Sequence, residues 1–216
     1  MKKIEAFRAF RAAIKDPNRL GDAAIYKSEI GGARARPEIE AQIANLETTF
    51  PDVEVEPLLE LPRGTVGREY AELLRANGLD PFRISEQLPR DVLRRNIFIA
   101  RYALLHDVYH VLTGFDTSWA GEAGVWGFVA GQRYLWTYWI NVIMTCVIYP
   151  LLAPWQTLRI WRNAIRGVRM GRRAATLIAM PIETMWARPV TELRVTHRIE
   201  ASDDLAIPKV APLSAA

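Results

Sequence analysis

The sequence predicts an all-α protein, built as a single multi-helix domain with an apolar slot or tunnel between its helices. Apolar residues recur every three or four positions along most of the chain, which is the spacing of a helix face. Alternation typical of a strand occurs only over residues 52–61, where Pro57 interrupts it. Half of the 216 residues are hydrophobic and 24% are charged, as in a globular domain with a core. We expect this domain over residues 1–200 and a flexible tail over residues 201–216.

The first helices are predicted to be short. The opening stretch has apolar residues at helical spacing up to Ile14 and meets a stop signal, "DPN", at residues 16–18. Residues 36–50 predict a further helix whose apolar positions face inward. Residues 65–78 predict another, with Thr65 as its cap and Gly78 as its stop.

Longer helices follow. Residues 89–114 predict one long helix, because Pro89 suits a first turn and Gly114 suits an end. A reversal through "GFDT" would then begin a new helix near Asp116 or Thr117, running through the aromatic residues up to Phe128. The single cysteine, which permits no intrachain disulfide and no thiolate metal cluster, makes a reducing compartment the default.

Residues 134–158 contain no charged side chain and are numerous enough to span a membrane. Pro150 and Pro154 break the helix near its end, and Asn141 and Gln156 add polarity. We therefore favour a buried core helix that lines the apolar slot, over a helix that dips into a membrane and over a true span. The tryptophans that could line the slot are Trp126, Trp136 and Trp139, and a role as ordinary core stays open as the simpler alternative for most of them singly.

A stripe of arginines follows at steps of three, four, three and four residues, so its members share one helical face. The stripe comprises Arg159, Arg162, Arg166, Arg169 and Arg173. A basic face beside apolar residues suits anionic lipid headgroups or a lipid phosphate. The simpler alternative is a solvated face. Nucleic acid ranks last, because the formal charge is only +4 and no recognition motif accompanies the stripe.

The stretch "HDVYHVLTGFDTSWAGE", residues 106–122, indicates a metal site. Residues four apart lie on one helix face, so His106 and His110 can converge on one ion, with Asp107 at the edge of that face. Glu122 could point back at the pair after the reversal at Gly114. Nitrogen and oxygen ligands of this kind suit zinc, iron or manganese, and the sequence does not separate these ions.

Two alternatives stay open for this stretch. Asp107 could pair with Arg101 or Arg133, and Glu122 could simply favour a helix N-terminus. The pattern is also close to the H-E-x-x-H motif of zinc proteases, in which the glutamate is the general base. Here Asp107 takes that position and is one methylene shorter, which weakens a metallohydrolase hypothesis.

The pattern of His106, Asp107, His110 and, after eleven residues, Glu122 resembles the signature of the coenzyme Q biosynthesis protein 4 family. Two flanking stretches support the resemblance: "LPRGTVGREY" before the motif and "WARPVTELRVTHRI" after it. The resemblance covers about residues 55–200. It implies an all-helical fold, a metal site at the four motif residues, and a role in making ubiquinone or a related prenylated quinone. It also implies replacement of a ring carboxyl by hydroxyl on a polyprenylated hydroxybenzoate, an oxidative decarboxylation.

The resulting prediction is a metal-dependent enzyme of the decarboxylase or hydroxylase type. The predicted ligands are His106, Asp107, His110 and Glu122, with Asp107 and His106 as catalytic residues. Zinc is the first choice of cofactor, with iron, manganese and magnesium as alternatives. The candidate lipid-binding or phosphate-binding residues are Arg68, Arg159, Arg162, Arg166, Trp126, Trp136 and Trp139. The alternative role for Arg68 is a salt bridge with Glu69 or Glu72.

The expected partners are an isoprenoid lipid or prenylated quinone precursor, a membrane surface, other quinone-biosynthesis proteins and a second copy of the chain. We expect a cytoplasmic protein held peripherally at a membrane, or one on the matrix side of the mitochondrial inner membrane in a eukaryote. A non-catalytic protein that binds isoprenoid lipid or acts as a scaffold is the second hypothesis.

Overall fold

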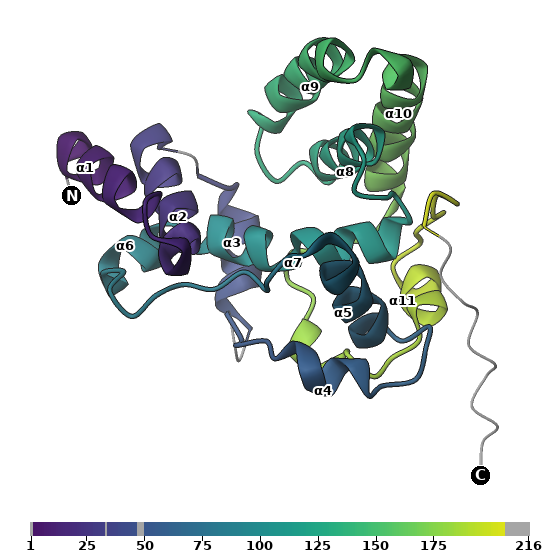
Figure 1. Ribbon diagram of the computed structural model, residues 1–216, viewed down its shortest axis with the longest axis horizontal. Coiled ribbons are helices and arrows are strands. Elements are labelled where there is room, and N and C mark those ends of the chain that lie inside the picture. The colour runs from purple at the N-terminus through teal and green to yellow at the C-terminus, as the bar shows by residue number, and fades with distance from the viewer. Residues whose placement is uncertain (1, 33, 47–49, 206–216) are drawn as a thin grey trace. The chain divides into compact units, whose positions relative to one another are not determined.

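The computed structural model describes residues 2–32, 34–46 and 50–205. Within these residues the regular structure is helical, apart from one isolated β-bridge between Thr65 and Pro189 (Figure 1). The all-α prediction is confirmed. The apolar slot or tunnel stays a prediction, as do the domain limits, and residues 206–216 of the expected tail lie outside the described residues.

The chain divides into two compact units, and the boundary falls within helix α7 (Ile97–Thr113). The first unit consists of Met1–Val53 and Asp80–His106, and the second of Glu54–Leu79 and Asp107–Ala216. Besides the start of α7, the helices of the first unit are α1 (Lys3–Ala13), α2 (Leu20–Gly31), α3 (Pro37–Ala44) and α6 (Arg90–Arg95). Helix α1 matches its prediction, whereas α3 starts close to the beginning of the helix predicted over residues 36–50 but ends at Ala44.

Helix α2 is not evident from the sequence, because its buried face carries no continuous apolar stripe. The face mixes Ile25 and Tyr26 with Gly21, Asp22 and Ser28, all of them buried. Asp22 accepts hydrogen bonds from the backbone and the hydroxyl of Ser85, at 2.9 and 2.6 Å. Tertiary partners therefore stabilise this helix where local patterning does not.

The long helix predicted over residues 89–114 is wrong at one point, because Asn96 divides it into α6 and α7. The Asn96 backbone leaves the helical region, with φ −116° and ψ 25°. Its buried side chain donates hydrogen bonds to Oε2 of Glu29, at 2.6 Å, and to the carbonyl of Val92, at 2.9 Å. An asparagine that bonds the backbone four residues earlier competes with the regular helix.

The second unit holds the remaining helices, shown from blue through green to yellow in Figure 1. They are α4 (Val55–Leu59), α5 (Val66–Asn77), α8 (Trp119–Gly131), α9 (Tyr138–Leu152), α10 (Thr157–Arg173) and α11 (Val190–Thr196). The stretch that alternates over residues 52–61 contains α4 rather than a strand. Helix α5 begins after Thr65 and ends at Gly78, which has a left-handed φ of 62°, so both predicted boundaries are confirmed.

Helices α8 and α10 pack with their backbones in contact. A Cβ atom added to Gly127 would overlap the carbonyl oxygen of Ala164, and one added to Gly167 would overlap that of Gly124. Gly131 and Gly171 face the same crossing. Small residues at these positions let the helices approach more closely than side-chain packing permits, so glycine is required there.

Helix α9 corrects the prediction of a buried core helix over residues 134–158. Its apolar side chains are largely exposed: Ile143 is 62% exposed and Leu151 is 78% exposed. The buried face is narrow and consists of Tyr138, Val142 and Thr145. Among the described residues, no helix has both the length and the hydropathy needed to cross a membrane.

Candidate metal centre

The last turns of α7 carry three of the four predicted ligands. One ligand atom from each of His106, Asp107 and His110 lies within 4.8 Å of the other two. Ligands bound to one ion at about 2.1 Å lie up to about 4.2 Å apart. The three side chains therefore need only small rotations to reach a common ion. Their positions one turn apart follow from the helix itself.

His110 is fully buried and held in one orientation. Its Nδ1 atom lies 3.0 Å from the carbonyl oxygen of Phe115, which can only accept, so Nδ1 donates. The chain makes this contact because Gly114 adopts a left-handed φ of 73° and turns Phe115 back toward the helix. In the neutral ring, the Nε2 atom then carries the lone pair. Metal-binding histidines are commonly oriented by a carbonyl in this way.

Glu122 lies in the first turn of α8 and faces His110. Its Oε1 atom is 3.2 Å from Nε2 of His110. Two ligands of a tetrahedral zinc ion lie about 3.4 Å apart, so this spacing suits a shared ion. The side chain of Ser118 accepts a hydrogen bond from the backbone of Gly121, at 3.2 Å, which caps the helix and fixes the turn that carries Glu122.

Asp116 holds the turn ahead of α8. Its Oδ1 atom accepts from the backbone and the hydroxyl of Ser118, at 3.1 and 2.5 Å, and its Oδ2 atom from Arg159, at 2.5 Å. Burial acts to raise the pKa of Asp116, but the hydrogen bonds from Ser118 and Arg159 outweigh it and hold the pKa below its ordinary value. Arg159 also lies 3.5 Å from Asp204, so it has an acidic partner on each side.

Other residues around the centre were not predicted. Burial, and then the negative charge of Asp107, raise the pKa of Tyr70, so this tyrosine stays protonated at neutral pH. Arg194 of α11 donates to the carbonyls of Val111 and Leu112, both at 2.9 Å, at the C-terminal end of α7. A cation there stabilises the helix end. The spacing of residues in the sequence gives no sign of either contact, because both join distant segments.

Comparison with known proteins identifies the family. The family described as "Coenzyme Q (ubiquinone) biosynthesis protein Coq4" matches residues 34–203, which is most of the chain. This chain belongs to the Coq4 family. The match begins further toward the N-terminus than the resemblance found in the sequence, and it includes all four candidate ligands.

Curated Coq4 relatives are similar over much of this chain. The ubiquinone biosynthesis protein COQ4 homolog, mitochondrial, of Danio rerio is 27% identical over 92% of this chain and 76% of its own length. The protein of that name from Rattus norvegicus is 30% identical over 66% of this chain and 53% of its own length. The chain thus spans only about half the length of the rat protein.

A solved structure has the same fold. It is the crystal structure of a candidate ubiquinone biosynthesis protein from Nostoc punctiforme, with a TM-score of 0.63 and 22% identity. The match covers 93% of this chain and 98% of the other. At this identity the likeness concerns the fold alone.

The two Coq4-like segments that flank the motif bind each other in the second unit. The backbone N–H of Val66 donates to the carbonyl of Arg188, and that of Gly67 to the carbonyl of Trp186, at 2.9 and 2.8 Å. The rings of Tyr70 and Trp186 lie 5.3 Å apart. These contacts place Tyr70, whose pKa depends in part on Asp107, against the C-terminal segment.

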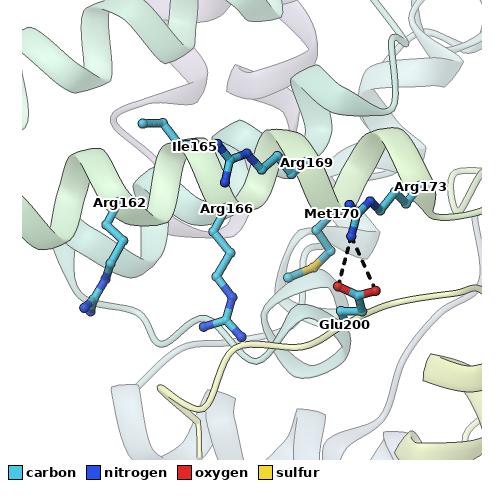
Figure 2. A pocket seen from close by; sticks show the side chains of 7 residues that line it. All are labelled: Arg162, Ile165, Arg166, Arg169, Met170, Arg173 and Glu200. Carbon is cyan, nitrogen blue, oxygen red and sulfur yellow. Dashed lines mark hydrogen bonds and ion pairs between the residues drawn. The ribbon is translucent and has the colours of Figure 1, made fainter.

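The predicted lipid-binding arginines lie in different surroundings. Arg68 donates to Glu72 at 2.6 Å, the salt bridge that was its alternative role, and Arg159 binds Asp116. Arg162 and Arg166 line a surface groove of about 660 Å³, which we call the arginine groove (Figure 2). Its other lining residues are Ile165, Arg169, Met170, Arg173 and Glu200.

The three predicted tryptophans do not share one environment. Trp126 packs edge-on against Tyr138, with ring centroids 5.7 Å apart. Trp139 lies beneath the guanidinium of Arg172, which is 5.4 Å from the ring centroid. Trp136 is 71% exposed. Their assignment to a lipid slot stays a prediction.

Proposed function

We propose that this protein is a divalent-metal-dependent member of the ubiquinone-biosynthesis machinery that acts on a polyprenylated hydroxybenzoate. The ligands would be His106, Asp107, His110 and Glu122. The observation that carries the proposal is the 3.2 Å separation between Nε2 of His110 and Oε1 of Glu122, with the other ring nitrogen held by a carbonyl. Nitrogen and oxygen ligands suit zinc first, and also iron, manganese or magnesium.

The proposed reaction replaces a ring carboxyl with hydroxyl. Dioxygen supplies one oxygen atom to the ring carbon, its second oxygen atom leaves as water with two electrons and two protons from an external two-electron reductant, and the carboxyl leaves as carbon dioxide. A bound divalent cation would supply a Lewis acid for the carboxylate or phenolate oxygen. The carbonyl of Phe115 fixes the orientation of the His110 ring. Asp107 would serve as a ligand or would hold a proton next to the bound ion. Tyr70, whose raised pKa keeps its hydroxyl protonated near Asp107, would present a neutral hydrogen-bond donor there and not a proton source.

The proposed substrate carries a long isoprenoid tail, and burial of such a tail stabilises a complex by about 0.8 kcal/mol per methylene. We propose that the protein works peripherally at a membrane surface, with other quinone-biosynthesis proteins or a second copy as partners. Several curated relatives are named as mitochondrial, which supports a mitochondrial location if this chain is eukaryotic, and there we propose the matrix side of the inner membrane.

One observation favours a second candidate function, a scaffold that binds lipid without catalysis. The apolar side chains of α9 are exposed, as are Trp155 at 78% and Leu158 at 79%, and such a surface suits binding more than chemistry. In this version the metal would hold α7 to α8 and would take no part in a reaction.

The experiment compares the chain with His110→Ala and with His197→Gln. The second variant removes an imidazole from the C-cap of α11, at a residue outside the four candidate ligands, and serves as the matched control. Metal content is measured by elemental analysis after reconstitution with each ion. Quinone synthesis is measured in cells that lack their own Coq4 protein, and carbon dioxide release is measured from a polyprenylated hydroxybenzoate labelled at the carboxyl.

The enzyme hypothesis expects one ion per chain, and loss of metal, quinone synthesis and carbon dioxide release in His110→Ala alone. Quinone synthesis that survives in a metal-free but folded His110→Ala variant would instead support the scaffold. A chain that binds none of the ions after reconstitution would refute the metal-dependent function.

A further inference from the structure

Helix α9 has an inverted distribution of polarity. Its buried face includes the hydroxyl-bearing Tyr138 and Thr145, whereas its exposed face is purely aliphatic apart from one methionine. The exposed residues are Ile140, Ile143, Met144, Val147, Ile148, Leu151 and Leu152. Their steps of three and one residues place them on a single stripe along the helix. Exposure of this apolar side to water is unfavourable, so its transfer to an apolar environment would lower the free energy.

The exposed stripe continues past the turn that joins α9 to α10. Trp155 and Leu158 are 78% and 79% exposed, and Trp161 and Ile165 are about half exposed. We call these residues, together with the stripe of α9, the apolar face. An exposed apolar patch of this extent is typical of a surface that binds a membrane or another protein.

The basic residues of α10 border the apolar face. Along α10 the exposed apolar residues and the arginines interleave, and Ile165 of the apolar face also lines the arginine groove. Figure 2 shows Arg162 and Arg166 pointing in the same direction from α10, and Arg173 reaching Glu200. In the described part of the chain, Arg162 and Arg169 make no ion pair, whereas Arg166 binds the carbonyl of Ala201 at 2.6 Å.

This combination matches the layers of a lipid surface. Apolar side chains of an interfacial helix enter the boundary of the acyl chains, and arginines meet the phosphates. A two-fold contact would bury the same patch of both copies together, and the groove in that patch has four arginines and only one carboxylate, Glu200, to balance them. Charge complementarity therefore favours an anionic bilayer over self-association.

We propose that the apolar face enters an anionic phospholipid bilayer while the arginine groove holds lipid phosphates at the headgroup level. The inference rests on the membrane-surface role in the proposed function and specifies the face and the lipid. It does not depend on the metal. Arg172, stacked on Trp139, adds a further cation at the edge of the face.

The first test is flotation of the full chain with vesicles, without substrate or added metal. Vesicles of phosphatidylcholine mixed with phosphatidylglycerol are compared with vesicles of phosphatidylcholine alone. We expect Val147→Glu and Leu151→Glu each to weaken binding to the mixed vesicles at least about tenfold, because each removes an inserted side chain and adds a charge. The matched control is Val195→Glu on α11, at a position 80% exposed, which should bind as the unaltered chain does.

The second test concerns the groove. We expect Arg162→Glu combined with Arg169→Glu to lower binding to mixed vesicles more than about twentyfold, at roughly fivefold for each arginine lost. Arg75→Glu on the exposed side of α5 is the control for a change in net charge and should have a small effect. Added salt should weaken the binding of the unaltered chain and of Arg75→Glu, but scarcely that of the double variant.

Two results would overturn the inference. If the chain binds mixed vesicles and none of the α9 or groove variants weakens binding, the membrane role survives but another face carries it. If the unaltered chain fails to bind and Val147→Glu turns a dimer into a monomer in sedimentation, the apolar face is an interface between copies. Neither result bears on metal binding by His110→Ala, so failure here and failure of the metal-dependent function are distinguishable.

Discussion

The Nε2 atom of His110 faces the Oε1 atom of Glu122 at 3.2 Å, joining the end of α7 to the first turn of α8. Because Nδ1 donates to the carbonyl of Phe115, both facing atoms carry lone pairs when the ring is neutral. A metal ion bound by both atoms would satisfy this pair. The contact is therefore the most informative point at which to test the candidate centre.

Glu122→Gln should lower zinc affinity by at least roughly 10–100-fold, the range seen when supporting groups around a metal are lost. The amide keeps the shape but loses the negative charge. Titration of the metal-free protein with zinc in the presence of a competing chelator measures the affinity. Glu60→Gln, at an exposed position beyond α4, is the control. Equal zinc affinity in the two variants would remove Glu122 from the ligand set.

Asp116→Asn should destabilise the protein by about 1–2 kcal/mol at neutral pH, after allowance for partial solvent screening of its pair with Arg159. The pKa of Asp116 is lowered on folding, so its contribution is present above the ordinary value of about 3.9 and is lost as pH falls through the folded value. The difference in unfolding free energy between the two proteins should therefore shrink below about pH 4. Urea unfolding at several pH values measures it, and a constant difference would contradict the ionic contribution.

Gly167→Ala should destabilise the protein by at least about 2 kcal/mol, because the new methyl group overlaps the backbone of Gly124 and the helices have to separate. Gly31→Ala is the matched control in a helix, since nothing lies within 4 Å of the added atom. The control should be stabilised by about 0.5–1 kcal/mol, the gain from replacing an exposed helical glycine. Thermal unfolding of both variants gives the comparison, and equal effects would mean that α8 and α10 are not in backbone contact.

Asn96→Ala should destabilise the first unit by about 1–3 kcal/mol, because two buried hydrogen bonds are lost. Burial acts to raise the pKa of Glu29, and hydrogen bonds from Asn96 and Arg95 outweigh it, so the variant should raise that pKa. Carbon-detected NMR of the Glu29 carboxyl follows the titration. Asn18→Ala, at an exposed position, should change neither quantity, and an unchanged Glu29 titration in Asn96→Ala would refute the assignment.

Local signals predicted much of the helical layout and of the candidate site. Gly78 marks the end of α5 because a left-handed turn depends on a single residue, and Thr65 takes the N-cap position although its hydroxyl donates to the carbonyl of Pro62. His106 and His110 share a face because helical geometry requires it. The approach of Glu122 depends on the turn at Gly114, which was also visible in the sequence.

The failures have a common physical origin in contacts between distant segments. Helix α2 buries Asp22 because Ser85 supplies its hydrogen bonds from far along the chain. The spacing of the arginines assigns Arg159 to an anion-binding stripe, but its guanidinium forms ion pairs with Asp116 and Asp204. Residues 134–158 read as core because an apolar helix looks the same whether its outer face meets protein or lipid. The sequence pattern shows which side chains are hydrophobic, but it does not show whether protein or lipid contacts them.

The glycine crossing of α8 and α10 has a mechanical consequence. Packed helices usually absorb small relative displacements through rotamer changes, but here backbone meets backbone and no side chain lies between them to yield. Helices α8 and α10 should therefore move as one rigid unit, which carries Glu122 at the start of α8 and the arginines along α10. If α10 binds lipid phosphates as proposed, this rigid unit would hold Glu122 at a fixed distance from the bilayer surface.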